Sequence, residues 1–203
     1  MQEVLLATRS EGKLRELRAL LLTEGVRVLD LTAAGIPESA AEDDLECFET
    51  FEENALAKAR YFRSRAGLPV IADDSGLSVD ALGGQPGVRS KRWSGRGDLR
   101  GPALDDANNA KLLATLAPFA DRRAGYVCVA AYSDDAGELV GRGEARGEIL
   151  PAPRGSGGFG YDPYFQSAEL GRTFAEATME EKGAVSHRGR AFAALLTALA
   201  ARR

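Results

Sequence analysis

The chain has 203 residues, a formal net charge of −4, and 44% hydrophobic and 28% charged residues. This balance predicts a single domain over residues 1–203 and disfavours broad binding to a nucleic-acid backbone. No apolar run approaches the roughly 20 residues of a membrane helix, and no signal peptide is recognisable, so we expect a cytoplasmic protein without a membrane partner. Two cysteines and one histidine are too few for a disulfide framework or a His/Cys zinc site.

The first third of the chain alternates short strands with helices. A buried strand is expected at Val4–Ala7, and the leucines of the following helix recur at helical spacing, at positions 14, 17 and 21. Phe48–Ala66 has the apolar stripe of a second helix, on which Asn54 and Lys58 share another face. Leu68–Ala72 is then expected to form a strand.

The rest of the chain mixes strands, loops and helices. A hairpin is expected from Tyr126–Tyr132 and Glu138–Leu150, because an Asp-Asp-Ala-Gly turn separates them. Strands that alternate with helices and are followed by a hairpin predict an α/β fold with a mixed sheet flanked by helices. The remaining expected elements are a short strand at Ser78–Leu82, a surface loop at Gly87–Pro102, a helix at Ala107–Leu116, a Gly/Pro-rich loop at Pro151–Pro163 and a helix at Arg188–Ala201.

Two adjacent carboxylates, Asp73 and Asp74, follow the strand expected at Leu68–Ala72, and Ser75 and Gly76 are expected to form a turn directly after them. Because adjacent carboxylates repel, the pair costs stability unless a cation or a proton shares the site. Mg²⁺ prefers such oxygen ligands. The alternative is an ordinary polar turn, since Asp, Ser and Gly are common turn formers. The pair is therefore a candidate metal or catalytic site.

The loop between the first strand and the first helix is a candidate phosphate-binding segment. A helix N-terminus offers free N–H groups and the positive end of its dipole. The loop also contains hydroxyl groups and cationic side chains. Its residues are Thr8, Arg9, Ser10, Glu11, Gly12 and Lys13. The alternative is an N-cap followed by a solvated lysine, and the spacing of a Walker loop is absent.

A glycine-rich segment, Gly155–Gly160, matches the letters of a dinucleotide-binding motif. Prolines precede it and Tyr161-Asp162-Pro163 follows it, so no helix opens there and the Rossmann interpretation is rejected. The aromatic ring of Phe159, like that of Tyr161, can stack on a base or fill the core. Farther along the chain, His187 and Arg188 bring donors that can read a carbonyl oxygen on a ring.

Six stretches of the sequence, taken in order, carry a resemblance to a known family. They are Thr8–Lys13, Phe51–Ala55 with Lys58-Ala59, Ala72–Leu77, Gly83-Gly84 with Pro86-Gly87, Gly157–Pro163, and Glu181-Lys182 with Ser186–Gly189. Together they resemble the Ham1/RdgB-type non-canonical purine nucleoside triphosphate pyrophosphatases, also called inosine triphosphatases. The resemblance implies an elongated mixed sheet with two lobes and a central cleft, a homodimer, and Mg²⁺-dependent hydrolysis of ITP, dITP and XTP to the monophosphate and pyrophosphate.

The resemblance also implies roles for individual residues. Asp74 matches the catalytic carboxylate that holds the metal and activates water. Glu46 matches the metal-binding glutamate, with Glu42 as its rival, because the chain departs here from the Glu-Glu-Thr-Gly of the family. The residues implied to face the phosphates are Thr8, Arg9, Ser10, Glu11, Gly12, Lys13, Lys58 and Ser75. The residues implied to hold the base are Phe159, Gly160, Tyr161, Asp162, Lys182, His187 and Arg188. Ser10 stands where the family has Asn, so we expect a shifted affinity with activity retained.

Two other functions use overlapping residues. A non-catalytic purine nucleotide-binding regulator would keep Phe159, His187 and Arg188 but would need no acidic cluster, and the presence of that cluster weighs against it. A general nucleotide or sugar-phosphate phosphatase would hydrolyse ATP and ITP at equal rates.

Overall fold

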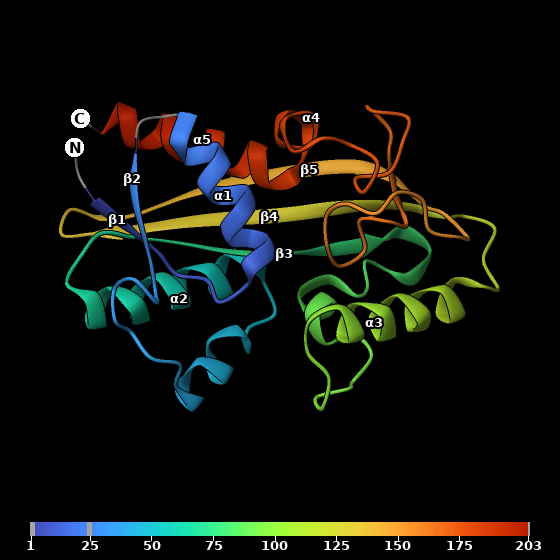
Figure 1. The fold of residues 1–203 in the computed structure, drawn as a ribbon, viewed down its shortest axis with the longest axis horizontal. Coiled ribbons are helices and arrows are strands. Elements are labelled where there is room, and N and C mark those ends of the chain that lie inside the picture. Colours follow the sequence, from blue (N-terminus) through green and yellow to red (C-terminus); the bar gives the residue numbers. More distant parts are fainter. Residues whose placement is uncertain (1–2, 24–25, 203) are drawn as a thin grey trace. The chain divides into compact units, whose positions relative to one another are not determined.

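The computed structural model describes residues 3–23 and 26–202, which form a six-stranded mixed sheet with helices (Figure 1). The strand order is β2-β1-β3-β4-β5-β6, in which β1 runs parallel to β2 and β3, and β5 runs antiparallel to β6. The strands are β1 (Glu3–Leu6), β2 (Arg27–Asp30), β3 (Val70–Val79), β4 (Arg123–Asp134), β5 (Gly137–Ile149) and β6 (Phe165–Ser167). The prediction of an α/β fold with a mixed sheet is confirmed. No helix within the described ranges combines the length and apolar character needed to cross a membrane.

The chain divides into two compact units, and β3, β4 and β5 contribute residues to both. Unit 1 contains the described residues up to Asp74, residues 128–143, and those from His187 onward. Unit 2 contains Ser75–Val127 and Glu144–Ser186. The division falls directly after the adjacent carboxylates.

The strands of unit 1 are covered on both faces, because successive strand residues point to opposite sides of a sheet. Figure 1 shows α1 (Glu11–Thr23) and α5 (His187–Ala201) on one side of these strands and α2 (Phe51–Ala66) on the other. The strand residues in the cluster with α1 and α5 are Val4, Leu6, Ile71, Cys128, Ala130 and Tyr132, and those in the cluster with α2 are Leu5, Val70, Ala72, Val129 and Ala131. Neighbouring residues of one strand therefore belong to different clusters.

Helix α2 begins later than the sequence pattern predicts, at Phe51 and not at Phe48. Thr50 is the N-cap, and its hydroxyl accepts a hydrogen bond from the amide of Glu53 at 3.1 Å. The amide of Phe48 instead donates to Asn54 Oδ1 at 3.0 Å. The N-cap threonine thus defines the helix start, since its side chain satisfies one of the first free N–H groups.

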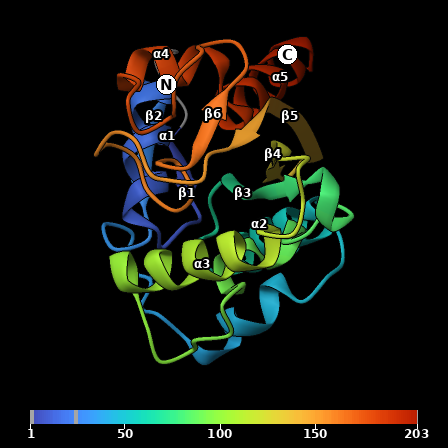
Figure 2. The same cartoon turned by 90° about the vertical axis from the view of Figure 1, so that its right-hand side faces the viewer.

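Unit 2 has its own core, built around three aromatic rings. Tyr126, Phe165 and Phe174 contact one another with centroid separations of 4.8 to 6.0 Å. Figure 2 shows α3 (Gly101–Leu116) on one side of the strands of this unit and α4 (Met179–Val185) on the other. Leu112 and Leu116 of α3 are fully buried in this core. Two short 3₁₀ helices, η2 (Asp80–Leu82) and η3 (Gly87–Arg92), complete the unit.

Several elements and boundaries predicted from the sequence are wrong. Strand β3 continues from Val70 to Val79, so Ser75 and Gly76 form no turn and Ser78–Leu82 is not a separate strand. The segment 87–102 is not all loop, because η3 occupies its start and α3 already begins at Gly101. The short elements β2, β6 and α4 were not expected from the sequence. The turn-forming character of Asp, Ser and Gly is overridden here by burial on both faces and by the ladder of the sheet.

Candidate active site

Strand β3 presents Asp73 and Asp74 to its two opposite faces, and both side chains are buried. Their residues are only 1% and 5% exposed. Burying an ionised carboxylate is costly unless charges or hydrogen bonds compensate it. The two aspartates are compensated by different sets of residues, and this difference separates their roles.

Asp73 lies among cations contributed by α1 and α5. Its Oδ2 is 3.1 Å from Lys13 Nζ and 3.4 Å from Arg188 Nε. Burial by itself raises the pKa of Asp73, but the nearby charges of Lys13, Arg188 and Lys58 outweigh it and hold the pKa below its ordinary value. Arg188 also donates to Glu16, and it is 2% exposed. Asp73 is therefore an ionised anchor for two cationic side chains.

Asp74 faces α2 and the 3₁₀ helix η1 (Ala40–Glu46). Its Oδ2 accepts a hydrogen bond of 2.8 Å from Asn54 Nδ2, and its Oδ1 is 3.8 Å from Lys58 Nζ. Lys58 Nζ in turn lies 2.7 Å from Glu46 Oε1 and donates to the backbone oxygen of Asp73. Burial raises the pKa of Asp74, and the charge of Glu46 adds to this although Lys58 opposes it.

The side chain of Asn54 is a part of this site that the residue-by-residue prediction did not include. It lies four residues before Lys58 on α2, and both side chains are buried although they are polar. Residues four apart on a helix share a face. The signal available in the sequence was an Asn and a Lys four residues apart beside an apolar helix stripe. In the structure, Asn54 orients the Asp74 carboxylate.

The structure separates Glu46 from Glu42, which the sequence left as rivals. Both oxygens of Glu42 accept hydrogen bonds from Arg9, at 3.0 and 2.8 Å. Glu42 also forms the capping box of η1 with Ser39. The guanidinium of Arg9 donates further to the backbone oxygens of Ile36 and Pro37, at 3.0 and 2.9 Å. Arg9 and Glu42 thus join the first loop to η1, whereas Glu46 lies with Lys58 and Asp74.

The other residues of the first loop surround the start of α1. The hydroxyl of Ser10 accepts from the amide of Lys13 at 3.4 Å, and the hydroxyl of Thr8 accepts from the amide of Ser10 at 3.2 Å. The hydroxyl of Ser10 thus satisfies one of the first free N–H groups of α1. Glu11 and Gly12 occupy the first turn of α1. The ammonium of Lys13, beside Asp73, is the charge that this loop brings to the acidic pair.

The donor set near Asp74 fits a hard divalent cation. Within the part of the chain that the structure describes, no three His, Cys, Asp or Glu side chains gather as a metal-binding group. Mg²⁺, however, is commonly held by one or two carboxylates together with substrate phosphates. Glu46 and Asp74 supply two carboxylates that share one ammonium neighbour, Lys58. The chemistry of these oxygens matches what Mg²⁺ requires.

A second polar cluster lies in unit 2, around the buried carboxylate of Asp162. Its Oδ2 accepts from Lys182 Nζ at 2.6 Å and from the amide of Phe159 at 2.8 Å. Lys182 Nζ also lies 5.2 Å from the centroid of the Phe159 ring and 5.4 Å from that of Phe174. The ion pair and the ring contacts of Lys182 together fix the glycine-rich segment that carries Phe159.

Glycines permit this close packing. Gly158 has a φ of +70°, and a Cβ placed there would lie 2.2 Å from Asp162 Oδ2. Gly155, at φ +77°, would likewise bring a Cβ within 2.5 Å of the Ala175 backbone. The glycine-rich segment is thus shaped by close approach of its backbone to other groups.

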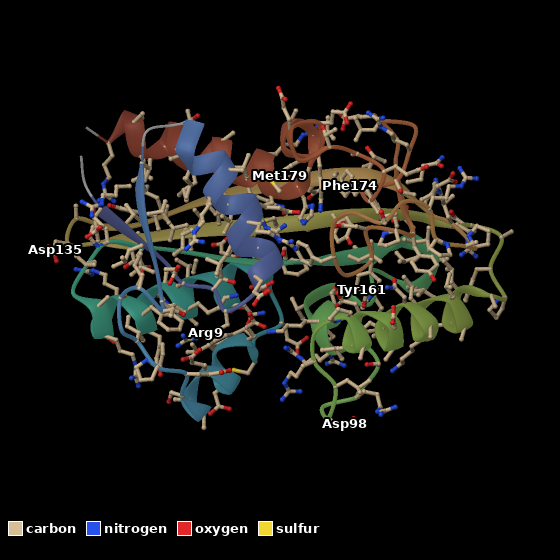
Figure 3. The ribbon with its side chains drawn as sticks, in the orientation of Figure 1. Arg9, Asp98, Asp135, Tyr161, Phe174 and Met179 are labelled. Carbon is tan, nitrogen blue, oxygen red and sulfur yellow. The ribbon has the colours of Figure 1, made fainter. Side chains whose placement is uncertain are left out.

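Tyr161 and Phe159 differ in position. Tyr161 is buried in the core of unit 2, and its hydroxyl donates to the backbone oxygen of Ser90 at 2.7 Å. The ring of Tyr161 therefore fills the core, which was one of the two possibilities predicted for it. Phe159 is only half-buried. Figure 3 labels Tyr161 and Phe174 within unit 2, and Arg9 within unit 1.

The remaining predicted residues fall on either side of the division of the chain. Ser75 is the first residue of unit 2 and lies half-buried in β3. His187 and Arg188, predicted to hold the base with Phe159, belong to unit 1, where they open α5 and are buried. Glu16 and Asp73, which form ion pairs with the Arg188 guanidinium, also belong to unit 1. Arg188 is thereby linked directly to the acidic pair, a contact that the sequence did not indicate.

Comparison with known proteins shows similarity along nearly the whole chain. The sequence model of the Ham1 family matches residues 4–198. A dITP/XTP pyrophosphatase from Frankia alni is 52% identical over 199 residues, covering 97% of this chain and 96% of that protein, and one from Ralstonia nicotianae is 48% identical over 202 residues, covering 98% and 97%. The solved structure of a HAM1 protein from Coxiella burnetii is 38% identical, with a TM-score of 0.82 and coverage of 98% of this chain and 99% of that chain.

Proposed function

The chain belongs to the Ham1 family, and we propose that it hydrolyses non-canonical purine nucleoside triphosphates, namely dITP, XTP and ITP, to the monophosphate and pyrophosphate. The observation that carries this proposal is the cluster around β3, where Asp74 is oriented by Asn54 and shares Lys58 with Glu46. Buried carboxylates and cations in one cluster are the groups that hydrolysis of a phosphoanhydride requires.

We assign the metal-holding role to Glu46 and Asp74, and Mg²⁺ as the metal. When bound, the metal supplies positive charge to the phosphate oxygens. Asp74 is positioned to accept a proton from the attacking water, because Asn54 fixes one carboxylate oxygen at 2.8 Å. The burial that raises the pKa of Asp74 also makes its carboxylate a stronger base.

Lys13 and Lys58 are assigned to the phosphates. Each ammonium lies beside an aspartate of β3, so each brings a positive charge to the acidic pair. The pyrophosphate that leaves is highly anionic, and lysines stabilise the charge that develops on it. Asp73 holds Lys13 in place without itself contacting the reacting atoms.

Base recognition is assigned to the segment Phe159–Asp162 together with Lys182. Inosine and xanthine carry a 6-oxo group, whereas adenine carries an amino group. A site that offers donors accepts the oxygen and leaves an amino group facing donors, which costs several kcal/mol when the groups are buried. Phe159, half-buried and beside the Lys182 ammonium, is the ring that this assignment uses for stacking.

The decisive experiment follows the products released from each nucleotide. Purified protein with Mg²⁺ and ITP, dITP or XTP should release pyrophosphate, and ATP should react much more slowly. Orthophosphate as the first product would contradict the assigned bond cleavage. Equal rates on ATP and ITP would support a general phosphatase, and tight ITP binding in calorimetry without hydrolysis would support a nucleotide-binding regulator.

The homodimer and the cytoplasmic location stay predictions from the resemblance. Size-exclusion chromatography with light scattering tests the first, and cell fractionation tests the second.

A further inference from the structure

Helix α3 holds the two peptide groups that flank Gly160 in the glycine-rich segment. The amide of Gly160 donates to Asp105 Oδ2 at 2.9 Å. The carbonyl oxygen of Gly160 accepts from Asn109 Nδ2, also at 2.9 Å. Asp105 and Asn109 lie four residues apart, so they share one face of α3.

The orientation of the Asn109 carboxamide is defined by its partners. Its Nδ2 donates both to Gly160 O and to Asp105 O, the second at 2.9 Å. Asn109 is 5% exposed, and its buried Oδ1 accepts no hydrogen bond from the described residues. A buried amide oxygen without a donor is costly, so the two contacts made by Nδ2 must outweigh that cost. The side chain is used here as a donor alone.

Gly160 lies between two residues to which base recognition is assigned. Gly160 follows Phe159, whose amide donates to Asp162 Oδ2, and it precedes Tyr161. Gly160 adopts a φ of +64°, and a Cβ there would meet nothing within 4 Å. Hydrogen bonds to the backbone N–H and C=O of Gly160, not packing around a side chain, therefore constrain this point of the segment.

We propose that Asp105 and Asn109 are positioning residues for base selection, which hold the backbone N–H and C=O of Gly160 so that the Phe159–Asp162 segment keeps the geometry needed to recognise a 6-oxo purine. This inference rests on the proposed function of that segment. Neither side chain contacts the nucleotide in this scheme. Both act through the backbone of Gly160.

Substitutions that remove either hydrogen bond test the pair. Asn109→Asp replaces the donor with a carboxylate oxygen that faces two carbonyl oxygens, and Asp105→Ala removes the acceptor for the Gly160 amide. Either change should raise KM for dITP about tenfold, the equivalent of one or two lost hydrogen bonds, with kcat much less affected. Asp105→Asn keeps an acceptor oxygen and should restore KM to near the wild-type value.

The matched control is Asn108→Asp. Asn108 is buried on the same helix, but it holds a different segment: its Oδ1 accepts from Ser94 N at 2.7 Å and its Nδ2 donates to Lys91 O at 3.1 Å. This variant should lose thermal stability comparable to Asn109→Asp while KM for dITP stays unchanged. Inhibition by inorganic tripolyphosphate, which carries no base, should be equal in all variants and in the wild type.

Hydrogen exchange provides a readout that does not depend on activity. The peptide covering residues 157–163 should exchange about tenfold faster in Asp105→Ala than in Asp105→Asn or in the wild type. An unchanged KM in both Asn109→Asp and Asp105→Ala, or an equal rise of KM in Asn108→Asp, overturns the inference. If Asn109→Asp does not fold, the half-exposed Asp105 decides the outcome. If the wild type hydrolyses no purine triphosphate, the proposed function fails, and exchange alone then decides whether the pair holds the segment.

Discussion

The two polar clusters differ in what holds their side chains in place. Around β3, carboxylates and cations lie on regular elements, and several charges compensate one another: Asp73 with Lys13 and Arg188, and Asp74 with Lys58. In unit 2, the buried ion pair Lys182–Asp162 supports an irregular segment whose backbone is held by hydrogen bonds. The first cluster tolerates several charges because each is compensated by neighbours of the opposite sign. Such a cluster suits the binding of anionic phosphates. The second depends on shape, which suits discrimination between similar bases.

The cluster around β3 predicts that hydrolysis of dITP depends on Asp74. Asp74→Asn keeps the size of the side chain but removes the proton acceptor and one metal-holding charge, so kcat for dITP should fall at least about 10³-fold. A coupled assay for pyrophosphate measures this. Asp98→Asn is the matched control, because Asp98 lies on an exposed loop before α3, paired with Arg96, and is labelled in Figure 3. A fully active Asp74→Asn protein would remove Asp74 from its assigned role.

The buried ion pair between Lys182 and Asp162 predicts a large loss of stability when one partner is removed. Lys182→Met leaves the Asp162 carboxylate, 2% exposed, without its cation. The free energy of unfolding should fall by about 3–5 kcal/mol, as for other broken buried pairs. Urea denaturation measures the change, and the additional substitution Asp162→Asn should recover part of it. Arg96→Met in the fully exposed pair with Asp98 should cause a much smaller loss, because water screens that pair. Equal losses in the two pairs contradict the prediction.

The shared charges around Asp73 predict a pH dependence of stability. The folded-state pKa of Asp73 lies below its unfolded value, so the stabilisation is complete above about pH 4, the ordinary range of Asp, and is lost as pH falls toward the folded pKa. Asp73→Asn should lower the free energy of unfolding by about 3 kcal/mol at pH 7 and make its decline below pH ~4 shallower. Urea titrations in the presence of a chelator measure both effects. Parallel curves for wild type and variant would show that Asp73 carries no such linkage.

The same contrast explains how far the sequence could be interpreted. The buried strands and helices of unit 1 follow from periodicity, and the pair Asn54 and Lys58 could be placed on one face of α2 from their spacing. The continuation of β3 through Asp73 and Gly76 could not be predicted. Its residues favour turns individually, and the cations that stabilise them come from α1, α2 and α5, remote in sequence.

The glycine-rich segment was correctly expected to lack a helix, but its internal geometry was not predictable. The contacts of Gly160 to Asp105 and Asn109 join positions more than 50 residues apart, with separations of 55 and 51. No local pattern encodes such a pairing, because an Asp and an Asn four apart on a helix are usually solvated. Likewise, Arg9 could not be assigned to Glu42 before the position of the 3₁₀ helix η1, which carries Glu42, was known.

Alanine substitutions at two glycines of this segment distinguish the cost of close packing from the cost of backbone strain. These substitutions should have the smallest effects of those considered. Both have positive φ, +70° for Gly158 and +64° for Gly160, so alanine at either position costs about 1 kcal/mol in backbone energy. At Gly158 the new Cβ would also lie 2.2 Å from Asp162 Oδ2, which cannot move away without breaking its contacts to Lys182 and Phe159. Gly158→Ala should therefore destabilise the protein by about 2 kcal/mol or more and raise KM for dITP, whereas Gly160→Ala should lose only about 1 kcal/mol. Urea denaturation of the two variants measures the difference, and an equal loss would mean that Asp162 is free to shift.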